Sequence, residues 1–236
     1  MSIATLYDVH GNLRALEAVL REIPDDATIV VGGDVVAIGP EPSETLERLR
    51  ALGDRVLWLR GNTDRELTPG EPGLAPPGLF DDTRAALSEE QIAFLYALPP
   101  TVQIDRVLFC HATPRNDVDI FTMLTPEERL APIFADVDAD VVVCGHTHIQ
   151  FDREIDGIRL VNAGSVGMPY EDEPGAYWAL LGPGVELRRT EYDVDDAVAR
   201  YRGTGLPGVE ELIELMLTPP EPREVIDHAE QVVFSG

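Results

Sequence analysis

Apolar and polar residues alternate with two different periods along the first sixty positions. The segments NLRALEAVLREI and EPSETLERLRAL place apolar side chains three or four positions apart, which predicts two amphipathic helices. Short apolar runs in SIATLYD, ATIVVGGD and RVLWLRGN flank these helices and are typical of buried strands. The resulting β-α-β-α-β order predicts a parallel sheet with right-handed crossovers, and therefore an α/β fold.

The rest of the chain continues as a mixture of helices and strands. Residues 66–81 are dense in Pro and Gly and predict a loop or short insertion, followed by a helical pair in DDTRAALSEEQIAFLYAL. Strands are expected near 101–110 and at 139–144, with a helix after Thr125-Pro126 between them. The segment IQFDREIDGIRLVNAG predicts a hairpin, and AYWALL with GVELRRTEY predicts a second one. The last forty residues are acidic and mostly helical, with a Pro-rich interruption in TPPEPRE.

Length and composition fit one sizeable domain. The chain has 236 residues, is 44% hydrophobic and shows no internal repeat or clear linker, so a single domain is expected over residues 1–236. No apolar run is long enough to cross a bilayer, and the start MSIATLYDVHG has no signal-like leader, so we expect a cytoplasmic protein with no membrane partner. Cys110 and Cys144 fit buried, reduced thiols better than a disulfide framework.

Charge excludes several function classes. Forty-three acidic residues face eighteen basic ones, giving a net charge of −25, which argues against duplex nucleic acid as the main partner. All basic residues are Arg, so mechanisms that need a P-loop lysine, a Schiff base or a lysine general base are excluded. The bias itself also fits a GC-rich genome or a salty cytoplasm, and we draw no function from it.

Polar side chains gather where the predicted strands end. They follow five strands and include four of the five histidines: Asp8, His10 and Asn12, then Asp34, then Asn62 and Asp64, then His111, and finally His146 and His148. The carboxyl ends of strands in an open α/β sheet line the ligand crevice, so these side chains are expected at one sheet edge.

The spacing of the histidine pair suggests two cations. In an extended chain His146 and His148 would point the same way, with Cα atoms roughly 6.5–7 Å apart. Two metal ions bridged by one oxygen lie about 3.5–4 Å apart, so each imidazole could bind one ion. Asp8 and His10 have the same spacing, and Asp34 stands alone, as a bridging carboxylate would.

Each residue also has a simpler explanation. Asp8 or Asn12 could cap the following helix, Asp34 could be a turn residue, and Asn62 could adopt a left-handed conformation. His111 could be a hydrogen-bonded core histidine. Taken together these explanations fail, because caps and turns alone do not place four of five histidines at strand ends.

Five motifs carry a family resemblance. DVHGN, GGD, GNTD, CHATP and CGHTH resemble, in this order, the five blocks of the calcineurin-like metallophosphoesterases. DVHGNLRAL, GDVVAIGPEP and NAGSVGMP are similar to the small bacterial and archaeal phosphodiesterase-like branch. The resemblance covers about residues 3–190 and leaves 191–236 as an acidic extension. It implies a four-layer α/β/β/α sandwich with two mixed β-sheets.

The resemblance also implies a role for each motif residue. Asp8, His10 and His148 would bind a first metal ion, Asn62, His111 and His146 a second, and Asp34 would bridge both. Mixed imidazole and oxygen ligands suit Mn, Fe, Zn or Ni better than Mg or Ca, and we favour Mn. A metal-bridging hydroxide would attack phosphorus in line, which makes Asp34, Asn62 and His111 the central catalytic positions.

Two positions depart from the family pattern. Many phosphomonoesterases and protein phosphatases of the family have a leaving-group histidine where this chain has Thr63, and a hydroxyl is too weak an acid to replace it. The small phosphodiesterase-like members commonly lack that histidine too, so its absence favours a diester or a good leaving group. The family pattern has a second acidic residue at the position of Ala37, but that residue does not bind a metal ion directly.

Substrate contacts are expected from arginine. Arg115, four residues after His111, could clamp phosphate oxygens in a bidentate way, or form a surface ion pair with Asp117 or Asp119. Asn12 and Arg65 are further candidates. The expected function is hydrolysis of a small soluble, nucleotide-like phosphodiester. The alternatives are a phosphomonoesterase, a dinucleoside polyphosphate hydrolase, or a non-catalytic scaffold of the same fold.

Overall fold

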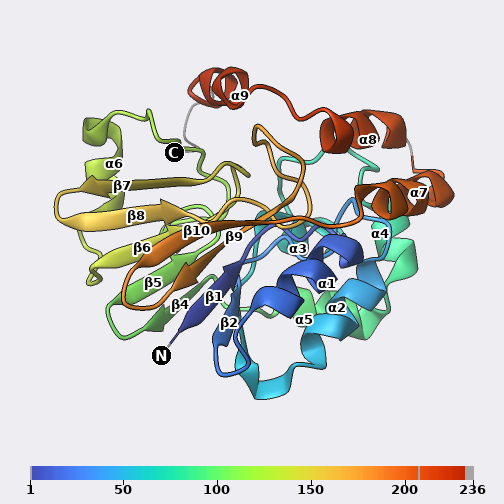
Figure 1. Ribbon diagram of the computed structural model, residues 1–236, viewed down its shortest axis with the longest axis horizontal. Coiled ribbons are helices and arrows are strands. Elements are labelled where there is room, and N and C mark those ends of the chain that lie inside the picture. Colours follow the sequence, from blue (N-terminus) through green and yellow to red (C-terminus); the bar gives the residue numbers. More distant parts are fainter. Residues whose placement is uncertain (1, 207, 232–236) are drawn as a thin grey trace.

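The computed structural model describes residues 2–206 and 208–231, which fold into two β-sheets with helices outside them (Figure 1). The strands within this part of the chain are β1 Ile3–Leu6, β2 Thr28–Val31, β3 Val56–Trp58, β4 Thr101–Ile104, β5 Val107–Cys110, β6 Val141–Cys144, β7 Phe151–Ile155, β8 Ile158–Asn162, β9 Ala176–Leu181 and β10 Val185–Thr190. The helices are α1 Leu13–Glu22, α2 Pro42–Arg50, α3 Asn62–Glu66, α4 Asp81–Ala86, α5 Glu89–Tyr96, α6 Glu127–Phe134, α7 Val194–Thr204, α8 Val209–Leu217 and α9 Pro222–Ala229, with a 3₁₀ turn at Gly53–Arg55.

The N-terminal half begins as the sequence predicts. β1, β2 and β3 are parallel neighbours, joined by α1 and α2. The first sheet has the order β10-β9-β1-β2-β3, because the second predicted hairpin returns to it and β9 pairs antiparallel with β1. The β-α-β-α-β prediction is therefore confirmed, and the sheet that contains it is mixed.

The second sheet is built from the middle of the chain. Its order is β4-β5-β6-β8-β7, with β5, β6 and β8 parallel and both edge strands antiparallel to their neighbours. The predicted hairpin turns at Asp156 and Gly157, between β7 and β8, both of which have positive φ. All strands expected in this region are present.

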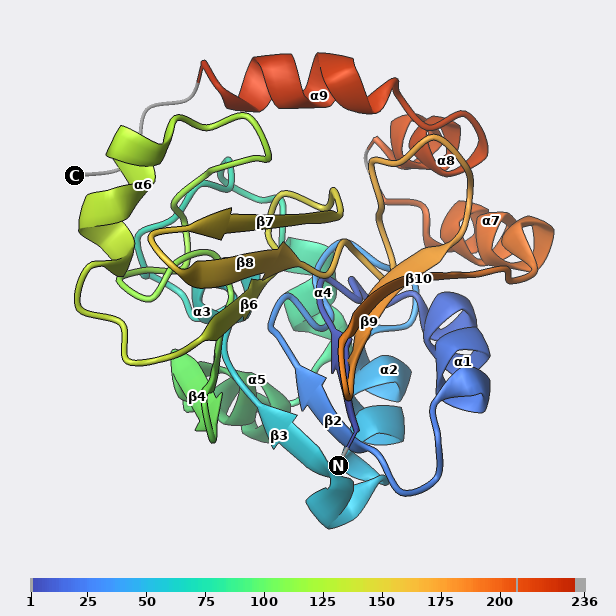
Figure 2. The same ribbon diagram turned by 60° about the vertical axis from the view of Figure 1, so that its left-hand side comes forward.

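The two sheets pack face to face. Tyr7, Val30, Phe109 and Val143 belong to a buried cluster between them, and the Tyr7 hydroxyl donates to the Val143 carbonyl at 2.9 Å. Separate apolar cores lie on the outer faces, under α1 and α2 on the first sheet and under α6 on the second. Figure 2 shows the same layers from a second side. The predicted four-layer α/β/β/α sandwich is confirmed.

The C-terminal helices lie against the first sheet's helical layer and across the end of the sandwich. α7 packs beside α1, where Arg14 Nε lies 2.6 Å from a carboxylate oxygen of Asp196. α9 crosses the molecule between α8 and α6 in both views (Figures 1 and 2). The Pro-rich segment separates α8 from α9, as the sequence predicts; residues 232–236 lie outside the described part.

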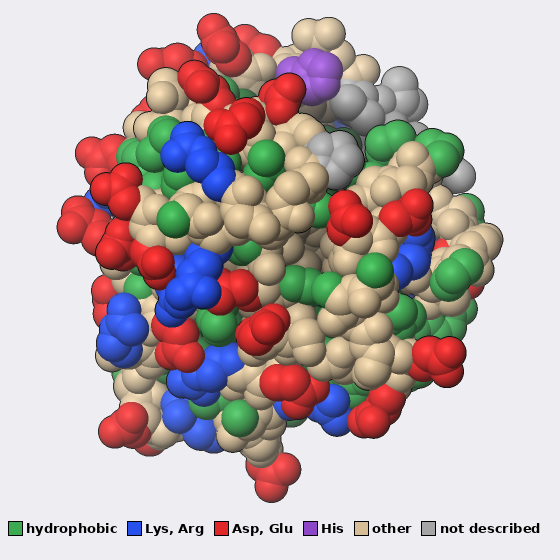
Figure 3. Space-filling model, turned by 90° about the vertical axis from the view of Figure 1, so that its right-hand side faces the viewer, with side chains coloured by type: hydrophobic (Ala, Val, Ile, Leu, Met, Phe, Trp, Pro, Cys, Tyr) green, Lys and Arg blue, Asp and Glu red, His purple; other side chains and the backbone are tan. Residues whose placement is uncertain are grey.

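The surface reflects the acidic composition. On the face shown in Figure 3, acidic side chains outnumber the arginines, which are scattered between them. Within the described residues, none of the helices combines the length and apolar character needed to cross a bilayer.

Candidate metal centre

The loops that follow the strands of both sheets bring seven polar side chains together. Asp8 and His10 follow β1, Asp34 follows β2, and Asn62 begins α3 after β3; His111 follows β5, and His146 with His148 follows β6. The sequence predicted one sheet edge, and this is wrong. The sheets face each other, so the carboxyl ends of β1–β3 meet those of β5 and β6.

The backbone at these residues is not extended. Asp8, His10, Asp34, His146 and His148 all have positive φ, between 47° and 67°. The left-handed region is unusual for residues other than glycine and costs free energy, so the turns are held by their surroundings. The expected extended His-x-His geometry is therefore wrong: each loop coils tightly after its strand and turns its side chains into the space between the sheets.

The side chains form two adjacent groups. Asp8, His10 and His148 form one, and Asp34, His111 and His146 form the other; within each group the potential ligand atoms lie within 4.8 Å of one another. One Oδ of Asp34 is 3.9 Å from Nε2 of His10 and the other 3.6 Å from Nε2 of His111, so Asp34 lies between the groups. The two histidines of the pair belong to different groups, as the sequence analysis expected.

Hydrogen bonds to the backbone orient three imidazoles. Nδ1 of His10, His111 and His148 lies 2.9, 2.9 and 2.6 Å from the carbonyl oxygens of Ala37, Gly32 and Met168. A carbonyl only accepts, so each Nδ1 carries a proton, and the neutral form of each ring then has its lone pair on Nε2. This is the tautomer that a metal ligand needs, with Nε2 facing the centre.

Asn62 is oriented by a carboxylate. Its amide nitrogen donates to Glu66 at 3.2 Å, which leaves its oxygen 3.2 Å from Nε2 of His111. Glu66 is itself held by the backbone N–H groups of Leu74 and Ala75. The Asn62 oxygen is thus presented to the centre as a neutral ligand atom.

Burial and mutual charge set the protonation states. Burial lowers the pKa of His10, as does nearby His148, and burial with the charge of His111 lowers the pKa of His146 to about 4. Burial would raise the pKa of Asp8, but the charges of His148 and His111 outweigh it and hold this pKa well below its usual range. The lowered pKa values favour the neutral form of His10 and His146 and the ionised form of Asp8, which are the forms that bind metal ions.

The centre fits divalent cations on its own geometry. Oδ1 of Asp8 and Nε2 of His146 are buried and, among the residues described, make no hydrogen bond. Leaving one buried polar atom without a hydrogen-bond partner costs about 1–3 kcal/mol of folding free energy. Two such atoms close together are therefore expected to bind a further group, and a cation fits this place. Burial would lower the pKa of His111 and of His148, but the negative charges of Asp34 and Asp8 outweigh it and raise both values. A bound cation would compensate the same negative charge.

Sequence reasoning placed Asp64 at a strand end without giving it a role, and in the structure this residue ties two loops together. The carboxylate of Asp64 accepts the backbone N–H groups of Asp34, Val35 and Gly61 at 2.8, 3.0 and 3.0 Å. The contact with Gly61 begins α3, a helix that the strand-end interpretation of GNTD did not foresee. Burial and nearby Asp34 raise the pKa of Asp64 to about 7. The acidic last letter of GNTD was the signal that could have identified it.

Close backbone approach explains two motif glycines. A Cβ on Gly61 would lie 2.1 Å from Oδ1 of Asp34, and one on Gly145 would lie 2.4 Å from Oδ2 of Asp8. Neither carboxylate could keep its place beside a larger residue.

Tyr170 is a further neighbour that the sequence did not identify. Its ring stacks on the imidazole of His148, with the two ring centroids 5.1 Å apart.

The predicted substrate residues have different surroundings. Arg65 and Arg115 line a cavity of about 230 Å³ whose wall includes His111. Arg115 forms a bidentate pair with buried Asp119, one of the two ion-pair partners considered from the sequence, and Arg65 pairs with Asp117 at 2.8 and 2.9 Å. Both guanidinium groups therefore lie in the same cavity wall as His111, and each is held by a carboxylate.

Asn12 has a structural role. Its side-chain oxygen accepts the N–H of Ala15 at 3.1 Å, which caps α1, and its nitrogen donates to the carbonyl of Gly167 at 3.1 Å. The capping alternative is confirmed for Asn12, whereas Asp8 belongs to one of the two candidate ligand groups. Substrate contact by Asn12 stays a prediction that this geometry does not support.

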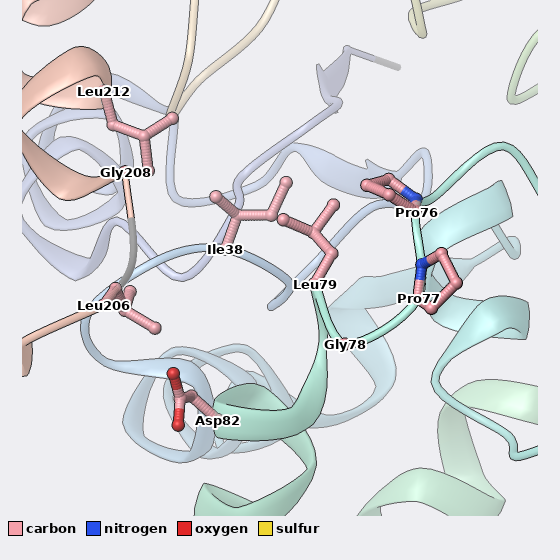
Figure 4. Close-up of a pocket in the computed structure, with 9 residues that line it drawn as sticks. All are labelled: Ile38, Pro76, Pro77, Gly78, Leu79, Asp82, Leu206, Gly208 and Leu212. Carbon is pink, nitrogen blue, oxygen red and sulfur yellow. The ribbon is translucent and has the colours of Figure 1, made fainter.

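A larger, apolar cavity of about 480 Å³ lies nearby. Figure 4 shows Ile38 and Leu79 on one side of it, with Leu206 and Leu212 from the C-terminal helical segment on another. Ile38 follows Ala37, whose carbonyl holds His10. The cavity therefore borders the loop behind the centre and contains none of the seven polar side chains.

A sequence profile of the calcineurin-like phosphoesterase superfamily domain matches residues 1–181. The chain belongs to the calcineurin-like phosphoesterase superfamily. The resemblance inferred from the five motifs is thus confirmed, and the profile covers every strand except β10.

Solved structures agree with this calcineurin-like assignment. A metallophosphoesterase crystal structure from Sphaerobacter thermophilus superposes with a TM-score of 0.76 at 29% identity, covering 90% of this chain and 97% of that one. A hypothetical protein from Pyrococcus horikoshii OT3 superposes with a TM-score of 0.81 over 93% and 99% of the two chains; at 22% identity it shows the shared fold alone.

Two sequence relatives cover most of this calcineurin-like chain. An uncharacterized protein of Methanocaldococcus jannaschii is 28% identical over 87% of this chain and 93% of its own length. The symmetrical bis(5'-nucleosyl)-tetraphosphatase of Pectobacterium atrosepticum is 30% identical over 79% and 76%. The relatives thus include a protein named as a tetraphosphatase.

Proposed function

We propose that this protein is a dinuclear metal-dependent phosphoesterase that hydrolyses a small, nucleotide-like phosphoester, with phosphodiesters preferred. One observation carries the proposal: two groups of imidazole and carboxylate ligands lie side by side, and Asp34 lies between them. When bound, the two cations supply the positive charge that polarises the phosphoester and lowers the pKa of an attacking water. The mixed donors favour Mn over Mg or Ca, with Fe, Zn and Ni as alternatives.

The protein's own residues would position the reacting groups. Asp34 would keep both cations close together, and the backbone carbonyls behind His10, His111 and His148 would prevent the rings from turning away. Asn62 would add a neutral oxygen. Arg115 would bring positive charge near phosphate oxygens beside His111.

The leaving-group position supports a diester preference. Thr63 Oγ1 is buried and makes no hydrogen bond within the described residues. A hydroxyl does not donate a proton readily at neutral pH, so the leaving group would depart without assistance from this position. Esters with good leaving groups would then react fastest.

Restoring an acid at this position is expected to change the preference. Thr63→His should raise kcat/KM for an alkyl phosphomonoester by about tenfold, because general acid catalysis contributes at least that much. Thr63→Phe supplies a ring without a transferable proton and is the control. Equal activity of the two variants, measured with Mn at several pH values, would show that proton donation at residue 63 does not limit the rate.

Metal binding gives a direct test of the proposal. After supplementation with Mn, the wild-type protein is expected to hold about two ions per chain by elemental analysis, and its unfolding midpoint should rise with Mn and fall on chelation. His148→Ala should hold fewer ions, whereas His228→Ala in α9, outside the centre, should match the wild type.

Two results would contradict the proposal. Near-zero transition metal after supplementation would favour a non-catalytic scaffold of this fold. Metal-loaded protein that cleaves neither aryl phosphodiesters nor aryl phosphomonoesters would refute the enzymatic role.

A dinucleoside polyphosphate hydrolase is the second candidate. The Pectobacterium atrosepticum relative, named for activity on a bis(5'-nucleosyl) tetraphosphate, favours it. A panel of bis(p-nitrophenyl) phosphate, p-nitrophenyl phosphate and diadenosine tetraphosphate separates the candidates by their relative kcat/KM values.

A further inference from the structure

The cavity beside His111 is lined by cations in a strongly acidic protein. Arg60, Arg65 and Arg115 all contribute to its wall, whereas the whole chain has a net charge of −25. Asp117 on the wall and Asp119 behind it compensate two of the three arginines. One positive charge remains next to a proposed metal ligand, where an anion would be attracted.

Arg60 supplies this uncompensated charge. Its Nη1 donates to the carbonyl of Tyr96 at 2.7 Å, and its guanidinium carbon lies 5.3 Å from the centre of the Tyr96 ring. Its Nε is buried without a hydrogen-bond partner, and no carboxylate of the described residues forms an ion pair with it. The side chain is therefore fixed by a ring and a neutral carbonyl, and its charge is left for a ligand.

Asn116 adds a neutral donor to the same wall. Its side-chain oxygen accepts the N–H groups of Val118 and Asp119 at 3.0 and 2.8 Å, which fixes the side chain on the cavity wall. Arg65 and Arg115 are held in place by their carboxylates, and Nη1 of Arg65 also donates to the carbonyl of Pro72. Planar cations with fixed N–H groups are suited to phosphate oxygens.

We infer that this cavity binds a second phosphate group of the substrate, next to the phosphate that is attacked at the metal centre. The inference rests on the proposed function and narrows its substrate class to phosphoesters with at least one further phosphate, such as nucleoside polyphosphates and dinucleoside polyphosphates. His111 belongs to both the centre and the cavity wall, so neighbouring phosphates of one chain would reach both.

Arg60→Gln tests the inference through substrate preference. The ratio of kcat/KM for diadenosine tetraphosphate to that for bis(p-nitrophenyl) phosphate is expected to fall about tenfold, which is the effect of losing one charge-assisted hydrogen bond. The matched control is Arg55→Gln: Arg55 also donates to backbone carbonyls, those of Pro24 and Ala27, but does not line the cavity. Its ratio should equal that of the wild type.

Direct binding provides a measurement that does not need turnover. In calorimetric titrations, the affinity for inorganic tripolyphosphate should fall about tenfold in Arg60→Gln, while the affinity for orthophosphate should change less than about twofold. High salt should weaken tripolyphosphate binding to the wild type, because the cavity is partly open to solvent.

The outcomes distinguish the two proposals. Active enzyme whose substrate ratio and tripolyphosphate affinity are both unchanged in Arg60→Gln would overturn the second-phosphate site and leave the phosphoesterase proposal standing. Protein without phosphoesterase activity that still binds tripolyphosphate in an Arg60-dependent way would refute the proposed function and support an oligophosphate site.

Discussion

Asp34→Asn is expected to fold like the wild-type protein and to lose phosphoesterase activity by about 10³-fold or more. Asp34 lies between the two ligand groups, so the substitution removes negative charge from the place where both cations would be held. The fold should persist, because an asparagine keeps the oxygen that accepts the N–H of Thr63 at 2.9 Å. Steady-state kinetics with Mn and a thermal unfolding curve measure the two effects separately.

An exposed aspartate provides the control for this charge change. Asp25→Asn alters net charge equally in a turn between α1 and β2 and should retain wild-type kinetics. Full activity of Asp34→Asn would contradict the assignment of the centre. A large loss of thermal stability in that variant would instead mean that Asp34 acts mainly in folding.

Asp64→Ala is expected to lower the free energy of unfolding by about 3–5 kcal/mol and to reduce activity as well. The substitution leaves three N–H groups, those of Asp34, Val35 and Gly61, without their acceptor in a buried region. Each buried N–H group without an acceptor costs about 1–3 kcal/mol of stability. Water that enters the space left by the side chain would form some of these hydrogen bonds and reduce the total loss. Without this tie the loops that carry Asp34 and Asn62 would separate, which disturbs the centre.

Urea unfolding monitored by circular dichroism measures this loss. Asp54→Ala removes an exposed carboxylate in the 3₁₀ turn and should change stability by less than about 0.5 kcal/mol. Asp64→Asn should fall between the wild type and Asp64→Ala, because it keeps one acceptor oxygen. If Asp64→Ala were as stable as the control, the two loops would have to be held together by other contacts.

The spacing of apolar residues predicted most of the helices and strands, but it did not predict how they are arranged in space. The helical and extended segments are local properties, so α1, α2 and the two hairpins follow from nearby residues. The pairing of β9 with β1 joins Leu181 to Ile3, and no local pattern encodes such a contact. The division of the strands into two sheets came from the family resemblance alone. α3 was missed because its start depends on a side-chain contact within one turn, between Asp64 and Gly61.

The seven polar residues could be identified from the sequence, because strand ends and motif order both mark them. Their geometry could not. The prediction of extended backbone at His146 and His148 was wrong, because both residues have left-handed backbone conformations. From sequence, that conformation is normally expected only at glycine. The supporting contacts were also hidden: the carbonyls of Gly32, Ala37 and Met168 are backbone groups, and any residue type could supply them.

The two ligand groups draw on chain segments separated by up to 140 positions: Asp8 and His148 share one of them. During translation the ribosome releases Asp8, His10 and Asp34 long before the strand that precedes His146 exists. The early segment alone therefore contains only some of the candidate ligands of each group. Tight binding of the proposed cations would therefore require that β6 and its loop have emerged and docked, so cation uptake would come late in the maturation of the newly made polypeptide.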